Sequence, residues 1–266
     1  MLPLSSPKFS RGFTLIEIIA VIVVLSILAV LGGKFVVEST QAYQSTQTKS
    51  RLINTSRQAL ERMSRQLRIA LPYSLRITNN SACLEFLPIA SGGNYPDYVP
   101  DSVNSAAKKT TLDVSPHSIG FGTAIYVSIG AMAPGELYGA SPSSLATLTS
   151  RSVNVINFSP EKGWKQNSIN KRFYLLDRPQ AFCIVNNQLR FYADQDVTAG
   201  EVNTNSAFSL LAENVTSPTV PFALTLGSEN RNTIVQFNIT FAQANTLKGG
   251  TESVNMNHSV MIRNVP

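Results

Sequence analysis

The amino-terminal part of the chain carries the longest hydrophobic run in the sequence. From residue 13 to residue 37 almost every position is apolar, and Glu17 is the one acidic residue. As a helix this segment would be about 37 Å long, which exceeds the roughly 30 Å of a bilayer core. The run therefore predicts a membrane-spanning helix over 13–37. A carboxylate near the start of such a span costs about 1–3 kcal/mol, so Glu17 is a candidate functional residue.

The next segment, 38–71, has the pattern of an amphipathic helix. It is polar and free of proline, and one apolar stripe recurs at steps of three or four residues. The stripe consists of Leu52, Ser56, Leu60, Met63 and Leu67, with Ala59 and Ala70 beside them. Glu61 lies on the other side, four residues from both Arg57 and Arg65, and can pair with either. Because Pro72 stops a helix, we expect one helix over 13–71, about 88 Å long, whose stripe packs on a head.

Beyond Pro72 the pattern changes to short alternating segments separated by turn-rich loops. The predicted strands are 74–78, 83–87, 125–129, 153–158, 172–176, 222–226, 233–241 and 254–263. The clearest hairpin joins 181–185 to 188–192 through Asn186 and Asn187, which suit a type I′ turn. A short helix is predicted over 208–214. The fold class is therefore α+β, with a long helix packed on an antiparallel β-sheet head.

Three long segments are predicted to be loops: 90–110, 130–150 and 194–207. They are rich in Ser, Asn, Gly and Pro, and loops of this length are often functional or mobile. The organisation that follows is a leader over 1–12, a span over 13–37, an amphipathic helix over 38–71 and a head over 72–266. The length of the head permits one globular body or two lobes.

The charge distribution argues against nucleic acid as a partner. The whole chain has a net charge of +6, but residues 1–72 carry nine basic and three acidic residues and therefore all of the excess. The remaining residues carry thirteen of each sign. A head that binds nucleic acid should show a basic surplus.

The start of the apolar run carries an ordered motif. A basic residue, Arg11, is followed by Gly12, then by Phe13-Thr14-Leu15-Ile16-Glu17 and the apolar segment. This stretch resembles the class III signal of type IV prepilins and secretion pseudopilins. The resemblance implies that prepilin peptidase cuts after Gly12 and N-methylates Phe13, and that Glu17 guides filament assembly. It also implies other pilin subunits, major and minor, and an inner-membrane assembly platform as partners.

Short segments of the rest of the chain are similar to one branch of that family. They are 59–72, 83–89, 182–185, 210–215 and 263–266. They resemble the minor pilins of the mannose-sensitive haemagglutinin (MSHA) pilus, the MshO-like group. The resemblance implies a low-abundance subunit that helps to start, cap or tune a surface pilus used in attachment.

Other interpretations of the sequence stay open. One is a type II secretion pseudopilin near the filament tip, which would carry the same signal. Another is a single-span anchored periplasmic binding protein or enzyme. An ordinary secretory signal is a further alternative, since Val30-x-Gly32 would pass as a small-residue cleavage site. That interpretation leaves Glu17 without a purpose.

Lys8 and Arg11 precede the span, which favours a cytoplasmic amino terminus, a span in the lipid of the inner membrane and a periplasmic head. The two cysteines, Cys83 and Cys183, would then lie in an oxidising compartment. We expect them to form a disulfide that closes a loop of about 100 residues; two buried free thiols are the alternative.

No group of residues has the spacing of a catalytic or metal site. His117 and His258 stand without Cys, Asp or Glu at metal-ligand spacing, and no nucleotide-binding or nucleophile motif is present. We therefore expect no cofactor and no enzymatic activity. Asp194 and Asp196, with Glu201 nearby, form the one acidic cluster. It lacks the full oxygen-ligand spacing of a calcium loop, so a solvated turn is the favoured interpretation.

Overall fold

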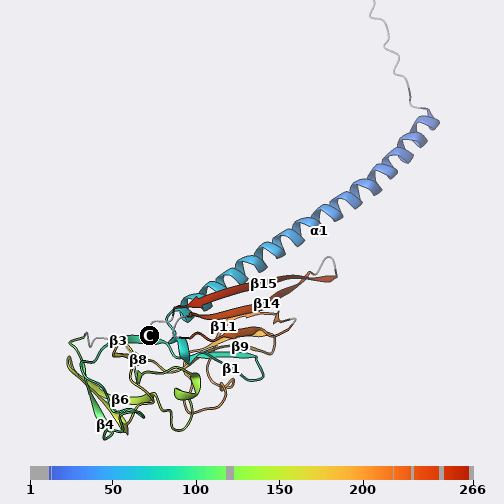
Figure 1. Ribbon diagram of the computed structural model, residues 1–266. Coiled ribbons are helices and arrows are strands. Elements are labelled where there is room, and N and C mark those ends of the chain that lie inside the picture. Colours follow the sequence, from blue (N-terminus) through green and yellow to red (C-terminus); the bar gives the residue numbers. More distant parts are fainter. Residues whose placement is uncertain are drawn as a thin grey trace, which may run out of the picture.

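The structure is a computed structural model, and Figure 1 shows a long helix that projects from a β-rich head. It describes residues 12, 14–117, 123–217, 219–228, 231–245 and 249–263. Helix α1 (Leu15–Arg68) is continuous over 54 residues and runs through Gly32 and Gly33 without a break. It confirms the single long helix, which starts two residues later and ends three residues earlier than predicted. A short 3₁₀ turn, η1 (Pro72–Ser74), follows it.

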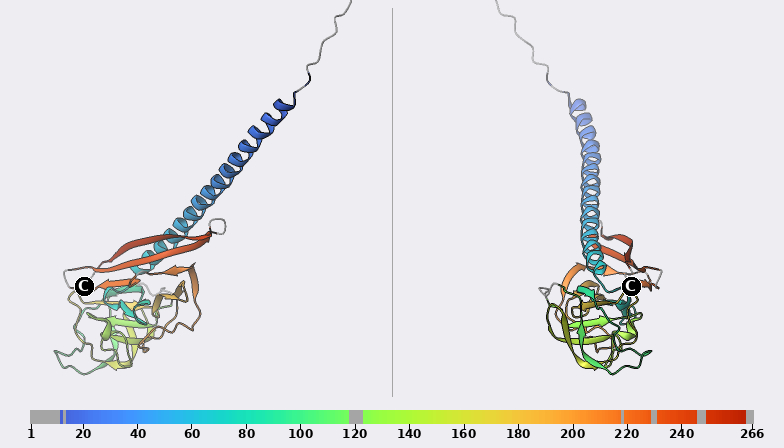
Figure 2. Two further views of the ribbon diagram at one scale, coloured as in Figure 1. Left: turned by 90° about the vertical axis from the view of Figure 1, so that its right-hand side faces the viewer. Right: turned by 60° about the vertical axis from the view of Figure 1, so that its left-hand side comes forward.

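The second half of α1 packs on the head with the predicted stripe. Its buried residues are Leu52, Ser56, Ala59, Leu60, Met63, Ser64 and Leu67. In both views of Figure 2 this half lies against the head while the first half stands clear of it. The stripe joins a core that includes Phe182, Phe237 and Phe241, contributed by two different sheets. Apolar burial at steps of three and four thus attaches the helix to the head.

One of these sheets has five strands in the order β1-β2-β9-β10-β11. They are β1 (Arg76–Thr78), β2 (Cys83–Phe86), β9 (Gln180–Val185), β10 (Gln188–Tyr192) and β11 (Ser209–Glu213). All four pairings are antiparallel. Asn186 and Asn187 have φ values of 51° and 58°. Both lie in the left-handed region that a type I′ turn requires, so the predicted hairpin is confirmed.

The second sheet is built on one long hairpin. Strand β14 (Thr233–Asn245) pairs along its whole length with β15 (Gly250–Ile262). Two short strands, β12 (Val215–Thr216) and β13 (Phe222–Thr225), also pair with β14. The hairpin runs beside α1 (Figure 1) and is tied to it by Glu252. The Glu252 carboxylate accepts a hydrogen bond from Ser45 Oγ at 2.6 Å and lies 3.4 Å from Lys49 Nζ.

A six-stranded antiparallel sheet forms a separate lobe in the order β3-β8-β5-β6-β7-β4. Its strands are β3 (Ile89–Asn94), β4 (Lys109–Asp113), β5 (Tyr126–Ile129), β6 (Leu145–Arg151), β7 (Val155–Lys162) and β8 (Arg172–Leu176), with a 3₁₀ turn η2 (Pro134–Glu136). It has its own core, in which Trp164 meets Phe158 edge to face at 5.5 Å. All six strands come between β2 and β9 in the sequence, although β2 and β9 are neighbours in space. The lobe is therefore an insertion, and the fold is the predicted α+β arrangement of a long helix on antiparallel sheets.

The predicted helix over 208–214 is wrong. This segment forms β11, the edge strand of the five-stranded sheet, in which Ala212 lies opposite Leu189. A short segment with a few apolar residues, here Phe208, Leu210, Leu211 and Ala212, fits either helix or strand. The unpaired edge of β10 decided the outcome, since pairing there satisfies the backbone groups of both strands.

Two of the three predicted loops are wrong in part. The segment 90–110 contains most of β3 and the start of β4, and 130–150 contains η2 and most of β6. Glycine misled the prediction for β3, because Gly is usually depleted in strands. Here Gly92 and Gly93 lie against Phe173 of β8, and a Cβ on Gly93 would be 2.8 Å from the Phe173 ring. The third loop, 194–207, contains no helix or strand, as predicted.

Candidate functional site

The start of α1 is closed by a reciprocal pair of side chains. Thr14 is the N-cap: its Oγ1 accepts a hydrogen bond from the Glu17 backbone N–H at 3.3 Å. In return Glu17 Oε2 accepts hydrogen bonds from the Thr14 backbone N–H and from Thr14 Oγ1, both at 3.1 Å. This is a capping box, which satisfies donors that a helix start leaves free. The negative charge of Glu17 also lies at the positive end of the helix dipole.

Thr14 is the residue that the sequence analysis missed at this site. The spacing Thr-x-x-Glu before an apolar run is the signature of a capping box and could have identified it. Gly12 is exposed and precedes the helix, and a Cβ added to it would meet no atom within 4 Å. Phe13 lies outside the described residues. Two of the three predicted residues, Gly12 and Glu17, are thus placed at an open helix start.

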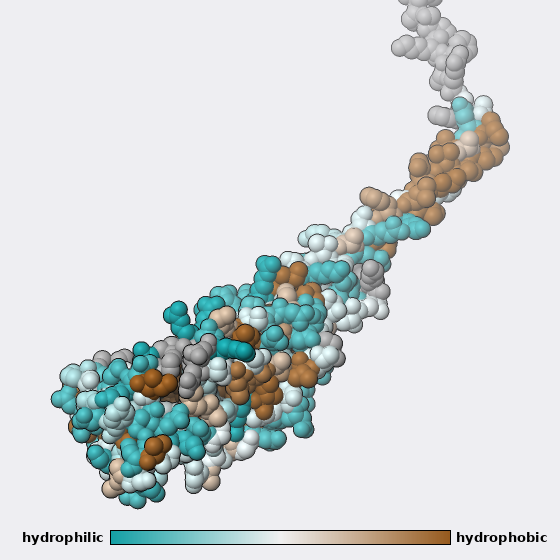
Figure 3. Space-filling model, viewed as in Figure 1, coloured by the Kyte–Doolittle hydropathy of each residue, from teal (hydrophilic) through white to brown (hydrophobic). Residues whose placement is uncertain are grey.

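The first half of α1 is apolar on all sides and entirely uncovered. It is the one helix of the described residues that is long and apolar enough to cross a membrane, by length and composition alone. None of its most hydrophobic stretch is buried against the head. This half is the brown section of α1 in Figure 3. Its polar Ser26 donates to the Val23 carbonyl at 2.8 Å, so this hydroxyl is satisfied within the helix.

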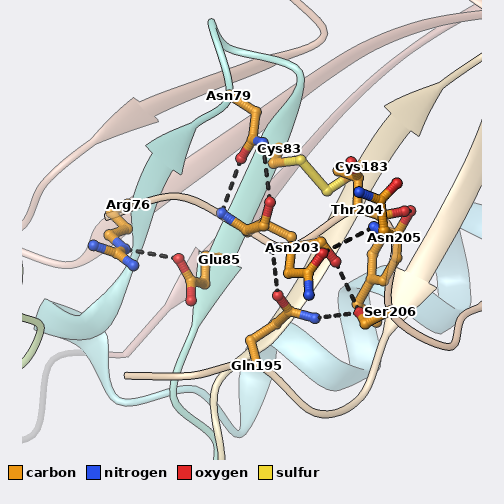
Figure 4. Close-up of a disulfide and its surroundings, with 12 residues drawn as sticks. Arg76, Asn79, Cys83, Glu85, Cys183, Gln195, Asn203, Thr204, Asn205 and Ser206 are labelled. Atoms are coloured by element: carbon orange, nitrogen blue, oxygen red, sulfur yellow. Dashed lines mark hydrogen bonds and ion pairs between the residues drawn. A yellow bond between two sulfur atoms is a disulfide. The ribbon is translucent and has the colours of Figure 1, made fainter. Parts of the chain in front are cut away.

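The two cysteines are joined. Cys83 in β2 and Cys183 in β9 form a disulfide with a Cα–Cα distance of 4.1 Å. Both side chains are fully buried. Figure 4 shows the bridge beside Asn79 and the loop that follows β10. The distance lies inside the limit of about 7 Å that a bridged pair requires.

The loop 194–207 is held by side chains rather than by strand pairing. Asn79 exchanges two hydrogen bonds with the Val202 backbone, at 3.0 and 3.1 Å. The buried Gln195 accepts from the Asn203 N–H at 2.7 Å and donates to Ser206 Oγ at 2.9 Å (Figure 4). These contacts hold the loop in place against Asn79 and within itself.

The two aspartates of the acidic cluster in this loop contact different partners. Asp194 pairs with Arg178 at 3.1 Å on the surface. The Asp196 carboxylate accepts the Thr198 backbone N–H at 2.9 Å, and this hydrogen bond lowers its pKa. Across the described residues no three His, Cys, Asp or Glu side chains are placed to hold a metal ion. Both carboxylates are exposed.

A buried ion pair connects the five-stranded sheet to the lobe. Arg76 Nε lies 2.7 Å from Glu85 Oε2, and Glu85 is only 1% exposed. The Arg76 guanidinium also covers the Tyr138 ring at 3.8 Å and donates to the Ala199 carbonyl at 2.8 Å. Burial raises the pKa of the Glu85 carboxyl, while Arg76 opposes that shift. Nothing in the sequence analysis singled out this pair.

Both histidines serve the fold. His258 Nε2 lies 3.1 Å from Ser64 Oγ and its ring stacks on Phe237, so it links β15 to α1. His117 Nδ1 lies 3.0 Å from the Val153 carbonyl, and its ring meets Phe173 edge to face.

Comparison with known proteins finds a match for one part of the chain only, its amino-terminal segment. The family model described as the prokaryotic N-terminal methylation motif matches residues 7–32, which include Gly12 and Glu17. No curated protein and no solved structure matches the chain. The motif indicates a type IV pilin-like prepilin, and hence a substrate of prepilin peptidase in a family of structural subunits. The uncovered apolar helix fits a membrane-anchored subunit of this kind.

Proposed function

We propose that this chain is a minor pilin, a low-abundance structural subunit of a type IV pilus. The observation that carries the proposal is the methylation motif placed at the start of a helix whose apolar half is uncovered on all sides. Prepilin peptidase cuts after Gly12 and methylates the new amino terminus at Phe13. The processed subunit remains in the inner membrane through α1, with its head in the periplasm, until it enters the filament.

Glu17 acts in assembly. Its carboxylate caps α1 through Thr14 in the precursor, and cleavage creates an amine four residues before it, at Phe13. Two opposite charges that pair in lipid offset the cost of burying each one alone. As the resemblance to prepilins implies, Glu17 of one subunit pairs with the Phe13 amine of a neighbouring subunit. This ion pair then selects the position at which a subunit joins the filament.

The MshO-like branch is the narrower form of this proposal. It is supported by the short segments that resemble that group, among them 83–89, which includes β2, and 182–185 in the hairpin of β9 and β10. A function in surface attachment belongs to the same narrower form.

Mass spectrometry of the membrane-extracted full chain tests the proposal. The expected mature protein starts at N-methylated Phe13. Gly12→Val should abolish cleavage, while Gly33→Val, the same change at another open glycine position, should leave it intact. A terminus at Met1, or one beyond Gly32, would overturn the prepilin assignment.

Sheared surface pili provide the second measurement. The processed subunit should be present in the pilus fraction at low stoichiometry. A processed subunit that never leaves the cell envelope and instead co-purifies with a type II secretion apparatus would replace the minor pilin with the pseudopilin alternative.

A further inference from the structure

The second half of α1 carries a concentration of positive charge that the head does not balance. Residues 49–68 contain six basic residues and one acidic residue, Glu61. This chain uses two of the six: Lys49 faces Glu252 at 3.4 Å, and the Arg62 guanidinium lies 5.3 Å from the centre of the Phe191 ring. The other four basic residues are all arginines.

These four residues form one face, which we call the arginine stripe: Arg51, Arg57, Arg65 and Arg68. All are exposed. Their spacing places them within about a third of the helix circumference, opposite the buried stripe, over a length of about 26 Å. No ion pair involves them among the described residues, and the predicted pairs of Glu61 with Arg57 and Arg65 are not formed.

The stripe is continuous with a shallow groove on the same helix. The groove is lined by α1 residues that include Tyr43, Gln47, Arg51, Asn54 and Gln58, and by Gln243 of β14. Tyr43 is 69% exposed. An aromatic ring, amide side chains and guanidinium groups on one surface are the composition of a protein interface, where Tyr and Arg are enriched.

Lipid headgroups do not neutralise the stripe. Arg51 lies fourteen residues beyond Val37, the last apolar position of the span, which is about 21 Å along the helix. The Debye length at physiological salt is about 8 Å, so the charge of a membrane surface is screened at that distance. The other three arginines lie still farther away.

A second copy of this chain is also a poor partner, because its head carries thirteen basic and thirteen acidic residues over 73–266. We propose that the arginine stripe docks the acidic surface of a different pilin subunit in the same filament. Guanidinium groups bind carboxylates through two parallel hydrogen bonds, which gives orientation as well as attraction. The inference rests on the proposed function, in which neighbouring filament subunits bring folded surfaces against α1 outside the membrane.

The test uses the full-length chain in detergent and, as probes, each of the other pilins encoded with it, purified in the same way. The variant Arg57→Glu/Arg65→Glu should weaken binding to one of these pilins by about tenfold or more, because like charges then oppose each other. The loss should shrink at high salt. Glu61→Gln, which removes the one acidic group of the face, should tighten binding.

Two control variants separate charge from folding. Lys109→Glu/Lys165→Glu makes the same change in charge at exposed positions of the distal lobe and should leave the affinity unchanged. Arg57→Lys/Arg65→Lys keeps the charge but loses the paired hydrogen bonds, so it should weaken binding less than Arg57→Glu/Arg65→Glu. Equal affinity of the wild type and the Arg57→Glu/Arg65→Glu variant for every pilin would overturn the inference. The inference would also be overturned if this variant bound the pilins normally but lost a retention on short double-stranded DNA that the wild type shows. That result would identify a nucleic-acid surface.

The mass of the amino terminus, measured on each variant, distinguishes this inference from the function on which it rests. A wild type without cleavage before Phe13 removes the pilin assignment itself. If the subunit is correctly processed and enters pili equally well with and without the charge reversal, the docking function of the arginine stripe is refuted and the pilin assignment is retained.

Discussion

Cys83 and Cys183 lie directly opposite each other on neighbouring strands, and their disulfide joins the two strands that precede and follow the six-stranded lobe in the sequence. They are register partners of β2 and β9, 100 residues apart in sequence. The whole lobe, β3 to β8, leaves the five-stranded sheet after β2 and returns before β9. The bridge therefore holds together the two strands that the insertion would otherwise separate.

The disulfide should contribute much of the stability of the head. In the chain-entropy description a loop of this length is stabilised by about 4–5 kcal/mol. We expect Cys83→Ala/Cys183→Ala to lower the free energy of unfolding by that order, measured by denaturant titration of the processed protein. Reducing agent should destabilise the wild type and leave the variant unchanged. Equal midpoints for oxidised wild type and variant would contradict the prediction.

Breaking the ion pair between Arg76 and Glu85 should make the free energy of unfolding depend on pH. Burial raises the pKa of the Glu85 carboxyl in the folded protein. The stability that the protonated Glu85 contributes is therefore fully present below the unfolded pKa and is lost as pH rises through the folded pKa. Arg76→Met removes the cation that limits this loss. The destabilisation should be small at about pH 4 and reach about 3 kcal/mol near neutral pH.

Two variants check this assignment. Adding Glu85→Gln to Arg76→Met should flatten the pH dependence, because no buried carboxyl group then titrates. Arg178→Met breaks the exposed pair with Asp194, and exposed pairs contribute at most about 1 kcal/mol. A pH-independent loss in Arg76→Met would show that packing on Tyr138, and not charge, accounts for the effect.

Helix packing should depend on the buried side of α1 alone. Met63 is 0% exposed, and Met63→Ala should cost about 2–5 kcal/mol through lost contacts and a residual cavity. Gln58→Ala, on the exposed side of the same helix, should change stability by less than about 0.5 kcal/mol. Thermal unfolding followed by circular dichroism measures both. Similar losses in the two variants would show that α1 does not pack on the head through its buried side alone.

Glu17 should be needed for assembly but not for folding or cleavage. Glu17→Leu should leave the Phe13 terminus and the melting temperature of the head unchanged, because α1 carries Glu17 far from the head. It should remove most of the subunit from sheared pili. Thr14→Val, which breaks the capping box while keeping the carboxylate, costs helix stability of about 1 kcal/mol and should assemble. Normal incorporation of Glu17→Leu would refute the proposed assembly function.

Some features could be predicted from the sequence because they are local. The apolar run after Glu17, the stripe with Leu60 and Met63, and the turn at Asn186 and Asn187 each depend on residues within a few positions of one another. Helix periodicity and turn chemistry are readable at that range. The long helix and the antiparallel hairpin were accordingly predicted close to where they lie.

The tertiary structure alone decided which strands exist in the glycine-rich and serine-rich segments. Gly92 and Gly93 become part of β3 because they pair with Tyr174 and Phe173 of β8, whose rings occupy the space next to them. The segment with Ala212 becomes β11 because β10 offers an unpaired edge. Neither partner is close in sequence, so local propensity could not reveal the pairing.

The chemistry around the bridge divides in the same way. The sequence by itself determined that Cys83 and Cys183 form an even pair suited to an oxidising compartment, and that a processing motif precedes a span. Only the tertiary structure placed Arg76 against Glu85 and Lys49 against Glu252. The physical reason is that motif and periodicity act along the chain. Burial and the pairing of charges depend on surfaces that meet only when distant segments pack together.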